Sequence, residues 1–205
     1  MNDLFNITTE EEFQAACLET FQYQYKNVEV YQKFVDFLGK NPSEVKKIED
    51  IPFLPIEMFK NHQVLDKAFV SAQTDKSTSY FQSSGTTRML NRSKHYIADF
   101  NLYEESIYKS FERFIGKPED YIFLGLLPNY SENPHSSLIY MVDFLMKKSA
   151  KPENGYFLYN HQELFELLQK LGKEDKKVIL FGVSFALLDF LDSITSDFGL
   201  RTSDF

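Results

Sequence analysis

Helical spacing of apolar residues dominates the first forty positions of the chain. Apolar and small side chains recur every three to four positions in residues 13–21, as on one face of an amphipathic helix. Thr8 or Thr9 precedes this pattern with a glutamate three residues later, which predicts a capping box at the helix start. A second helix is predicted over residues 28–38, since Pro42 follows soon after it.

Residues 41–65 combine large apolar side chains with three prolines. Proline removes a backbone donor and interrupts a helix, so long regular structure is excluded here. We expect a packed, extended connector with a short helix after Pro55. Residues 1–79 are therefore predicted to form an N-terminal segment of helices and connector.

Strand patterns and helix patterns alternate from residue 80 onward. Residues 77–82 predict a strand, a polar loop follows, and residues 93–116 predict a long helix. Three further strand–helix pairs are predicted, with strands in residues 120–128, 155–160 and 176–185 and helices in residues 136–149, 161–172 and 186–194. This order predicts an α/β fold with a mostly parallel sheet and flanking helices. The chain ends soon after the last helix, so we expect residues 80–205 to be an α/β subdomain truncated at its C-terminus.

Composition narrows the class of protein. The chain has 205 residues, of which 43% are hydrophobic, enough for a sizeable core. A formal net charge of −8 and the lack of a long basic run argue against a nucleic-acid partner. The single cysteine, Cys17, excludes a disulfide within the chain and favours a reducing compartment. No apolar run has the length of a signal peptide or a membrane span, so we expect a cytoplasmic protein.

Small hydroxyl residues and cations gather directly after the strand predicted at residues 77–82. Residues 83–87 read SSGTT, and Arg88, Arg92 and Lys94 follow. Backbone N–H groups approach a phosphate closely where side chains are small, hydroxyl groups add donors, and cations offset its charge. The spacing differs from the Walker pattern GxxxxGK[ST] and from the dinucleotide fingerprint GxGxxG. On spacing alone, a phosphate-binding loop and an ordinary surface loop both remain open.

The SSGTT segment resembles the phosphate-binding loop of the adenylate-forming enzymes, which include acyl-CoA ligases, luciferases and peptide-synthetase adenylation domains. Further segments are similar, in order, to the branch that contains phenylacetate–CoA ligases and LuxE-type acyl-protein synthetases: residues 48–65, 93–99, 126–146 and 179–191. The last three resemble the LuxE type in particular. The resemblance covers residues 41–195 and implies part of the large domain of an adenylate-forming enzyme.

This resemblance implies an acid–thiol ligase that uses ATP and Mg²⁺. A carboxylic acid, expected to be a fatty acid, would become an acyl-adenylate, and the acyl group would pass to the thiol of a protein or carrier, with a reductase as a possible partner. The matching positions that would bind the β- and γ-phosphates are Ser83, Ser84, Gly85, Thr86 and Thr87, with Arg88 and Lys94 adding charge. Arg88 departs from the family pattern, which has glycine at that position.

Other family features have no counterpart in this chain. The Tyr-Gly-x-Thr-Glu segment with its Mg²⁺-binding glutamate is missing, as is the small lid with its catalytic lysine, and Cys17 matches no acyl-carrier motif. No metal ligands and no catalytic residues are assigned, and we expect the chain by itself to be incomplete and inactive. The alternative is a non-catalytic partner subunit that binds a nucleotide or acyl group with an adenylation fold.

Three weaker candidates lie outside the loop. His62 could line an acyl pocket or belong to the connector, and His95 could reach a phosphate or bond locally. The apolar run 181–190 could form core or the wall of an acyl pocket, where Gly182 would let a substrate approach the backbone.

Overall fold

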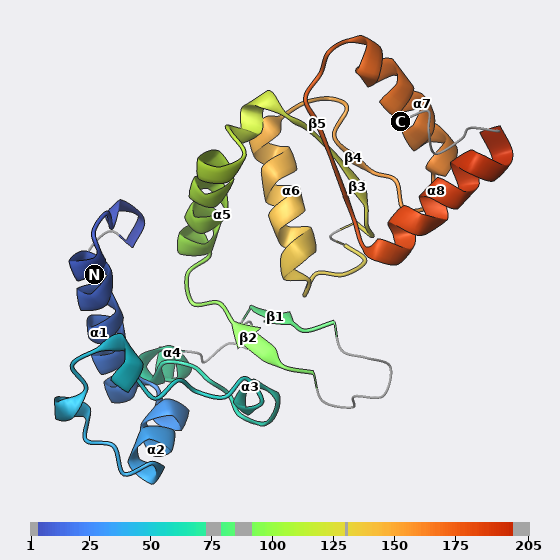
Figure 1. Cartoon of the computed structure of the whole chain (residues 1–205). Coiled ribbons are helices and arrows are strands. Elements are labelled where there is room, and N and C mark those ends of the chain that lie inside the picture. The colour runs from blue at the N-terminus through green and yellow to red at the C-terminus, as the bar shows by residue number, and fades with distance from the viewer. Residues whose placement is uncertain (1–3, 73–78, 85–91, 130, 199–205) are drawn as a thin grey trace. The chain divides into compact units, whose positions relative to one another are not determined.

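The chain folds into two compact units, residues 1–100 and residues 101–205, called here the N-terminal and the C-terminal unit (Figure 1). The computed structural model describes residues 4–72, 79–84, 92–129 and 131–198. In these parts of the chain, none of the helices combines the length and the apolar character needed to cross a membrane.

The N-terminal unit is helical and closes with a small hairpin. Its elements are the 3₁₀ helices η1 (Leu4–Asn6), η2 (Pro42–Glu44) and η3 (Ile48–Asp50), the α-helices α1 (Glu10–Asn27), α2 (Glu29–Phe37), α3 (Met58–Asn61) and α4 (Lys67–Ala72), and the strands β1 (Tyr80–Gln82) and β2 (Lys94–Tyr96). The predicted capping box begins α1: the Glu12 backbone N–H donates to Thr9 Oγ1 at 3.2 Å, and the Thr9 N–H donates to the Glu12 carboxylate at 3.1 Å. Backbone donation from Thr8 and Thr9 lowers the pKa of Glu12.

The core of this unit joins the two long helices to the connector. Its buried residues are Phe21, Val28, Tyr31, Val35, Val45 and Ile51. Val45 and Ile51 come from the proline-containing connector, so the prediction that this segment is packed is confirmed. The short helix expected after Pro55 is α3.

The helix predicted over residues 93–116 is wrong in its first part. Residues 94–96 form strand β2, which pairs antiparallel with β1 in register Gln82↔Lys94 and Tyr80↔Tyr96. The helix α5 begins only at Phe100. A strand partner decided the outcome, because pairing with β1 satisfies backbone groups that local propensity alone would have assigned to a helix. Strand β1 therefore lies in a two-stranded antiparallel sheet and not in the parallel sheet.

The C-terminal unit has a three-stranded parallel sheet in the order β4-β3-β5. Its elements are α5 (Phe100–Phe114), η4 (Pro118–Asp120), β3 (Ile122–Leu126), α6 (Ser137–Ser149), β4 (Gly155–Tyr156), α7 (His161–Lys173), β5 (Val178–Gly182) and α8 (Ser184–Phe198). The predicted α/β class with a parallel sheet and flanking helices is confirmed, although β4 is shorter than the segment predicted for it.

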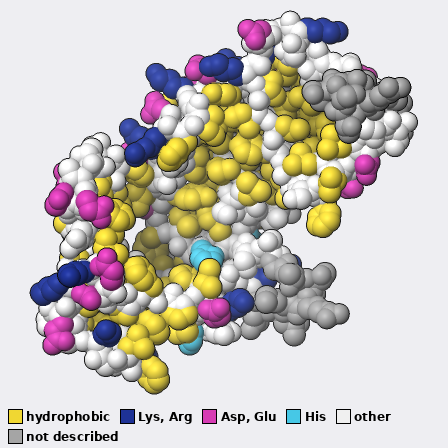
Figure 2. Space-filling view, viewed as in Figure 1, with side chains coloured by type: hydrophobic (Ala, Val, Ile, Leu, Met, Phe, Trp, Pro, Cys, Tyr) yellow, Lys and Arg dark blue, Asp and Glu magenta, His cyan; other side chains and the backbone are white. Residues whose placement is uncertain are grey.

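The central strand β3 is buried along its whole length, and its side chains contribute to two hydrophobic cores. Ile122, Leu124 and Leu126 pack with residues of α7 and α8. Phe123 and Leu127 point to the other face and pack with α5 and α6. The helices accordingly cover both faces of the sheet (Figure 1), and hydrophobic side chains also reach the surface over α6 and the sheet (Figure 2).

An asparagine joins strand β3 to helix α6. The Phe123 backbone N–H donates to Asn154 Oδ1 at 2.8 Å, and Asn154 Nδ2 donates to the Met146 carbonyl at 3.0 Å. Beside it, the buried Ser149 hydroxyl donates to the Tyr121 carbonyl at 2.6 Å. The Asn154 and Ser149 side chains thus bond to the backbone at the start of β3, and Asn154 adds a second donor to the Met146 carbonyl, which also accepts from the Ala150 N–H.

Candidate functional site

A polar pocket of about 490 Å³ lies in the N-terminal unit between α3 and the β1–β2 hairpin. Its lining comes from two stretches of sequence, residues 59–63 and the hairpin positions Gln82, Arg92, Lys94 and Tyr96. Gln82, Lys94 and Tyr96 share one face of the hairpin, because side chains alternate along a strand and the register places Gln82 opposite Lys94. Alternate side chains of the hairpin strands therefore line the same pocket.

The pocket has a positive local charge although the chain is acidic. Lys60, Arg92 and Lys94 line it, and its described lining residues include no aspartate or glutamate. Lys60 and Lys94 are partly buried, and partial burial strengthens their attraction for an anion. The Lys94 ammonium also lies 4.8 Å from the centre of the Tyr80 ring, a cation–π contact that helps to position it.

The predicted loop residues begin at the end of this hairpin. The Ser83 backbone N–H donates to the Ser93 carbonyl at 3.1 Å, and Ser83 Oγ accepts from the Ser93 N–H at 3.2 Å. The first bond uses the Ser83 N–H and the second uses its Oγ as an acceptor, so the hydroxyl proton of Ser83 is the donor that could bind a ligand. Ser84 is exposed. The other assigned positions, Gly85, Thr86, Thr87 and Arg88, lie outside the described residues, and their role stays a prediction.

Several residues of the pocket escaped the sequence analysis. Three of them, Lys60, Asn61 and Gln63, are ordinary polar residues of the connector. No local sequence pattern indicates that they contact a hairpin some thirty residues later. Arg92 belonged to the basic run after SSGTT but was not assigned to a site. His62 is exposed and lines this polar pocket.

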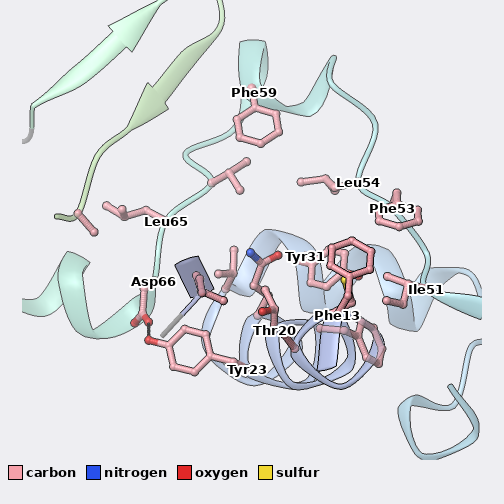
Figure 3. A pocket seen from close by; sticks show the side chains of 18 of the residues that line it. Phe13, Thr20, Tyr23, Tyr31, Ile51, Phe53, Leu54, Phe59, Leu65 and Asp66 are labelled. Atoms are coloured by element: carbon pink, nitrogen blue, oxygen red, sulfur yellow. Dashed lines mark hydrogen bonds between the residues drawn. The ribbon is translucent and has the colours of Figure 1, made fainter. Parts of the chain in front are cut away.

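An apolar cavity of about 940 Å³ lies in the same unit, beside helix α1 (Figure 3). It is bounded by α1 side chains such as Phe13 and Thr20 and by connector side chains such as Leu54 and Leu65. Cys17, which packs against the core of this unit, also lines the cavity. The figure shows Phe59 on the side of the cavity away from α1.

A polar contact closes one end of this cavity. The Tyr23 hydroxyl donates to the Asp66 carboxylate, which joins α1 to the start of α4. Asp66 also accepts from the backbone N–H of Ala68 at 2.7 Å, as an N-cap residue does. The bond to Asp66 raises the pKa of Tyr23. Both polar groups are thus used within the protein.

Phe59 contacts both the polar pocket and the apolar cavity. Its ring stacks on the imidazole of His95, with 4.7 Å between ring centres. His95 projects from the face of β2 opposite to Lys94, so it supports Phe59 and does not line the polar pocket.

Part of the apolar run 181–190 serves packing in the C-terminal unit, whereas Val183, Phe185 and Leu188 are exposed. Phe181 stacks on Phe123 with ring centres 6.1 Å apart, and Phe190 is buried in the core. A Cβ atom at Gly182 would lie 2.7 Å from Leu187 Cγ. The glycine therefore makes room for a packed leucine, and the space expected for a substrate is filled.

Metal ligands do not gather in the described part of the chain. No group of three or more His, Cys, Asp or Glu side chains suited to a metal ion occurs there.

Together, these features describe a mixed α/β protein with a cation-lined pocket, one of whose lining residues, Gln82, directly precedes the hydroxyl-rich SSGTT sequence. Residues 4–95, slightly less than half of the chain, match the family model of the acyl-protein synthetase LuxE. The matched part includes the predicted loop and all the lining residues of the polar pocket except Tyr96. The match confirms the resemblance to LuxE-type acyl-protein synthetases. No curated protein and no solved structure matches the chain.

Proposed function

We propose that the chain takes part in the ATP-dependent activation of a carboxylic acid and the transfer of its acyl group to a protein thiol. The observation that carries the proposal is the convergence of Lys60, Arg92 and Lys94 in one pocket, which Gln82, the residue directly before the SSGTT sequence, also lines. A triphosphate has the charge and the acceptor oxygens that such a group of donors would bind. The family match over residues 4–95 supports an acyl-protein synthetase in particular.

The residues divide into two roles. Ser83, Ser84, Gly85, Thr86 and Thr87 would surround the β- and γ-phosphates, with hydroxyl and backbone donors. Arg88, Arg92 and Lys94 would offset the charge, with Lys60 from the other wall of the pocket. Mg²⁺ would be held mainly by phosphate oxygens and water, because the described lining supplies no carboxylate.

The proposed reaction depends more on stabilising the negative charge of the leaving pyrophosphate than on a general acid or base. A carboxylate oxygen bonds to the α-phosphorus of ATP, the bond from that phosphorus to the bridging oxygen breaks, and pyrophosphate leaves. A thiolate then bonds to the acyl carbon, and AMP leaves. Fixed cations near the leaving pyrophosphate would lower the barrier of the first step. We place this reaction in the cytoplasm, with a fatty acid as substrate and a reductase as a partner for the acyl group.

ATP binding by the purified chain tests the site. Lys94→Met and Arg92→Met should each weaken ATP binding about tenfold, which is about 1.4 kcal/mol, in equilibrium dialysis with Mg²⁺. Lys40→Met is the matched control, since Lys40 is exposed in the same unit and lines neither cavity, and it should bind ATP like the wild type. Equal affinities for all four proteins would remove the pocket from the proposal.

Pyrophosphate exchange separates the enzyme from the non-catalytic alternative. The complete gene product should exchange labelled pyrophosphate into ATP when given a fatty acid, and Thr86→Ala should reduce this rate about tenfold or more. ATP binding without exchange for any acid of a broad panel would support a nucleotide-binding partner subunit instead.

A further inference from the structure

The apolar cavity of the N-terminal unit has the size of a small-molecule site. Its volume of about 940 Å³ falls within the range of about 300–1,000 Å³ found for ligand pockets. Most of its lining side chains are apolar, among them Phe13, Ala16, Ile51, Leu54 and Leu65. Such a lining favours a hydrocarbon group over a polar ligand.

The cavity alone does not suit a charged head group. Its described lining residues include no lysine, arginine or histidine, and its one carboxylate, Asp66, is bonded to Tyr23. A carboxylate buried there would lose its hydration without gaining a partner, which is unfavourable. A ligand with an acidic group therefore needs a second region that carries positive charge.

Phe59 lies between the cavity and such a region. The same ring lines the apolar cavity and the polar pocket that holds Lys94, Arg92 and Lys60. The stacking with His95 fixes this ring at the boundary. An apolar space and a cationic space that share one wall match the two ends of an amphiphilic anion.

We propose that the cavity binds the hydrocarbon chain of a long-chain carboxylate, whose head group reaches past Phe59 to the cations of the polar pocket. The inference rests on the proposed function for the identity of the ligand as an activated acid. It adds the place where the hydrocarbon chain binds, in the helical N-terminal unit and away from the parallel sheet.

Cys17 offers a direct readout of this site. It lines the cavity and is the only cysteine in the chain, so the rate of alkylation by N-ethylmaleimide reports access to the cavity. Dodecanoate, kept below its micelle concentration and without ATP, should slow alkylation about fivefold or more. Each methylene added between octanoate and dodecanoate should lower the half-effective concentration by up to about fourfold. An alkylation rate that dodecanoate does not change would overturn the proposal.

Two neighbouring alanines of α1 provide a matched pair of variants. Ala16 lines the cavity, whereas Ala15 is exposed and does not. Ala16→Phe should weaken dodecanoate binding, measured by calorimetry, about tenfold or more, and Ala15→Phe should bind like the wild type. Equal binding by both variants would place the hydrocarbon chain elsewhere.

The head group is tested separately, so that an Ala16→Phe variant that fails to fold does not decide the matter. Lys94→Met should weaken dodecanoate binding about tenfold and leave dodecanol binding unchanged, because only the acid carries charge. Equal losses for the acid and the alcohol would contradict the assignment of the head group. The two proposals can fail separately, since no nucleotide is present in the alkylation experiment. If the chain does not bind ATP but dodecanoate still slows alkylation of Cys17, the proposed function is refuted and the hydrocarbon site is not.

Discussion

The Tyr156 side chain buries a hydroxyl group that has no hydrogen-bond partner among the described residues. A buried phenol of this kind resists ionisation, and burial, with a smaller effect from Asp143, raises the pKa of Tyr156 to about 12. In the unfolded chain the same group titrates near pH 10. Between about pH 10 and pH 12, the unfolded state therefore releases a proton that the folded state retains, and stability falls as the pH rises.

Tyr156→Phe should remove this contribution to the loss of stability in base. The variant should unfold at the same or slightly higher urea concentration at pH 8, since it removes a buried polar group without a partner. Its stability should then decline less steeply than that of the wild type between pH 9.5 and pH 11.5. The control is Tyr159→Phe, because Tyr159 is 78% exposed, and an identical slope for both variants would contradict the assignment.

The residues of the polar pocket show which part of a site can be predicted from the sequence and which part cannot. SSGTT and Lys94 stood out in the sequence because hydroxyl groups and cations are local features, and their assignment to phosphate, which followed from the family resemblance, stays a prediction. Lys60 was not singled out, and His62 was considered only for an acyl pocket, because both line the polar pocket only once α3 packs near the hairpin. Side chains that meet through tertiary packing leave no local pattern.

At the scale of elements, Asn154 connects α6 to β3 through its two amide atoms. Asn154→Ala should lower the free energy of unfolding by about 1–3 kcal/mol, because the Phe123 N–H would lose the Asn154 acceptor in a partly buried place, whereas the Met146 carbonyl would keep its bond from the Ala150 N–H. Urea unfolding followed by circular dichroism measures this loss. Asn160→Ala is the control, since the Asn160 side chain makes a weaker bond at 3.3 Å to an exposed carboxylate, and it should change stability by less than about 1 kcal/mol.

Helices and buried strands were predictable where the apolar spacing decided the outcome. Helix α7 and strand β3 appear close to the predicted positions, since each has a clear period and a core to pack against. The error at residues 94–96 arose because three residues are too few to show a period. Their structure follows from pairing with β1, which is a contact between separate segments.

At the scale of the molecule, each unit has its own hydrophobic core. Val35 is fully buried in the N-terminal core, and Leu124 is fully buried in the core between the sheet and helices α7 and α8. Units with separate cores unfold as separate cooperative blocks unless a large interface couples them.

Leu124→Ala should therefore destabilise the C-terminal unit by about 2–5 kcal/mol and leave the N-terminal unit unchanged. Amide hydrogen exchange measured by mass spectrometry should show faster exchange in β3, α7 and α8, with unchanged exchange in α1 and α2. Val35→Ala should give the reverse pattern. Faster exchange in both units after either substitution would show that the chain unfolds as one block.

The bonds between Ser83 and Ser93 have a consequence for conformational entropy. They hold together the two ends of the segment that carries the hydroxyl residues and spans nine intervening positions. Bringing such ends together costs on the order of 2 kcal/mol in chain entropy. This entropy is lost when the hairpin forms during folding. It is therefore not lost again when an anion binds, and the binding affinity is higher than it would be for a segment with free ends.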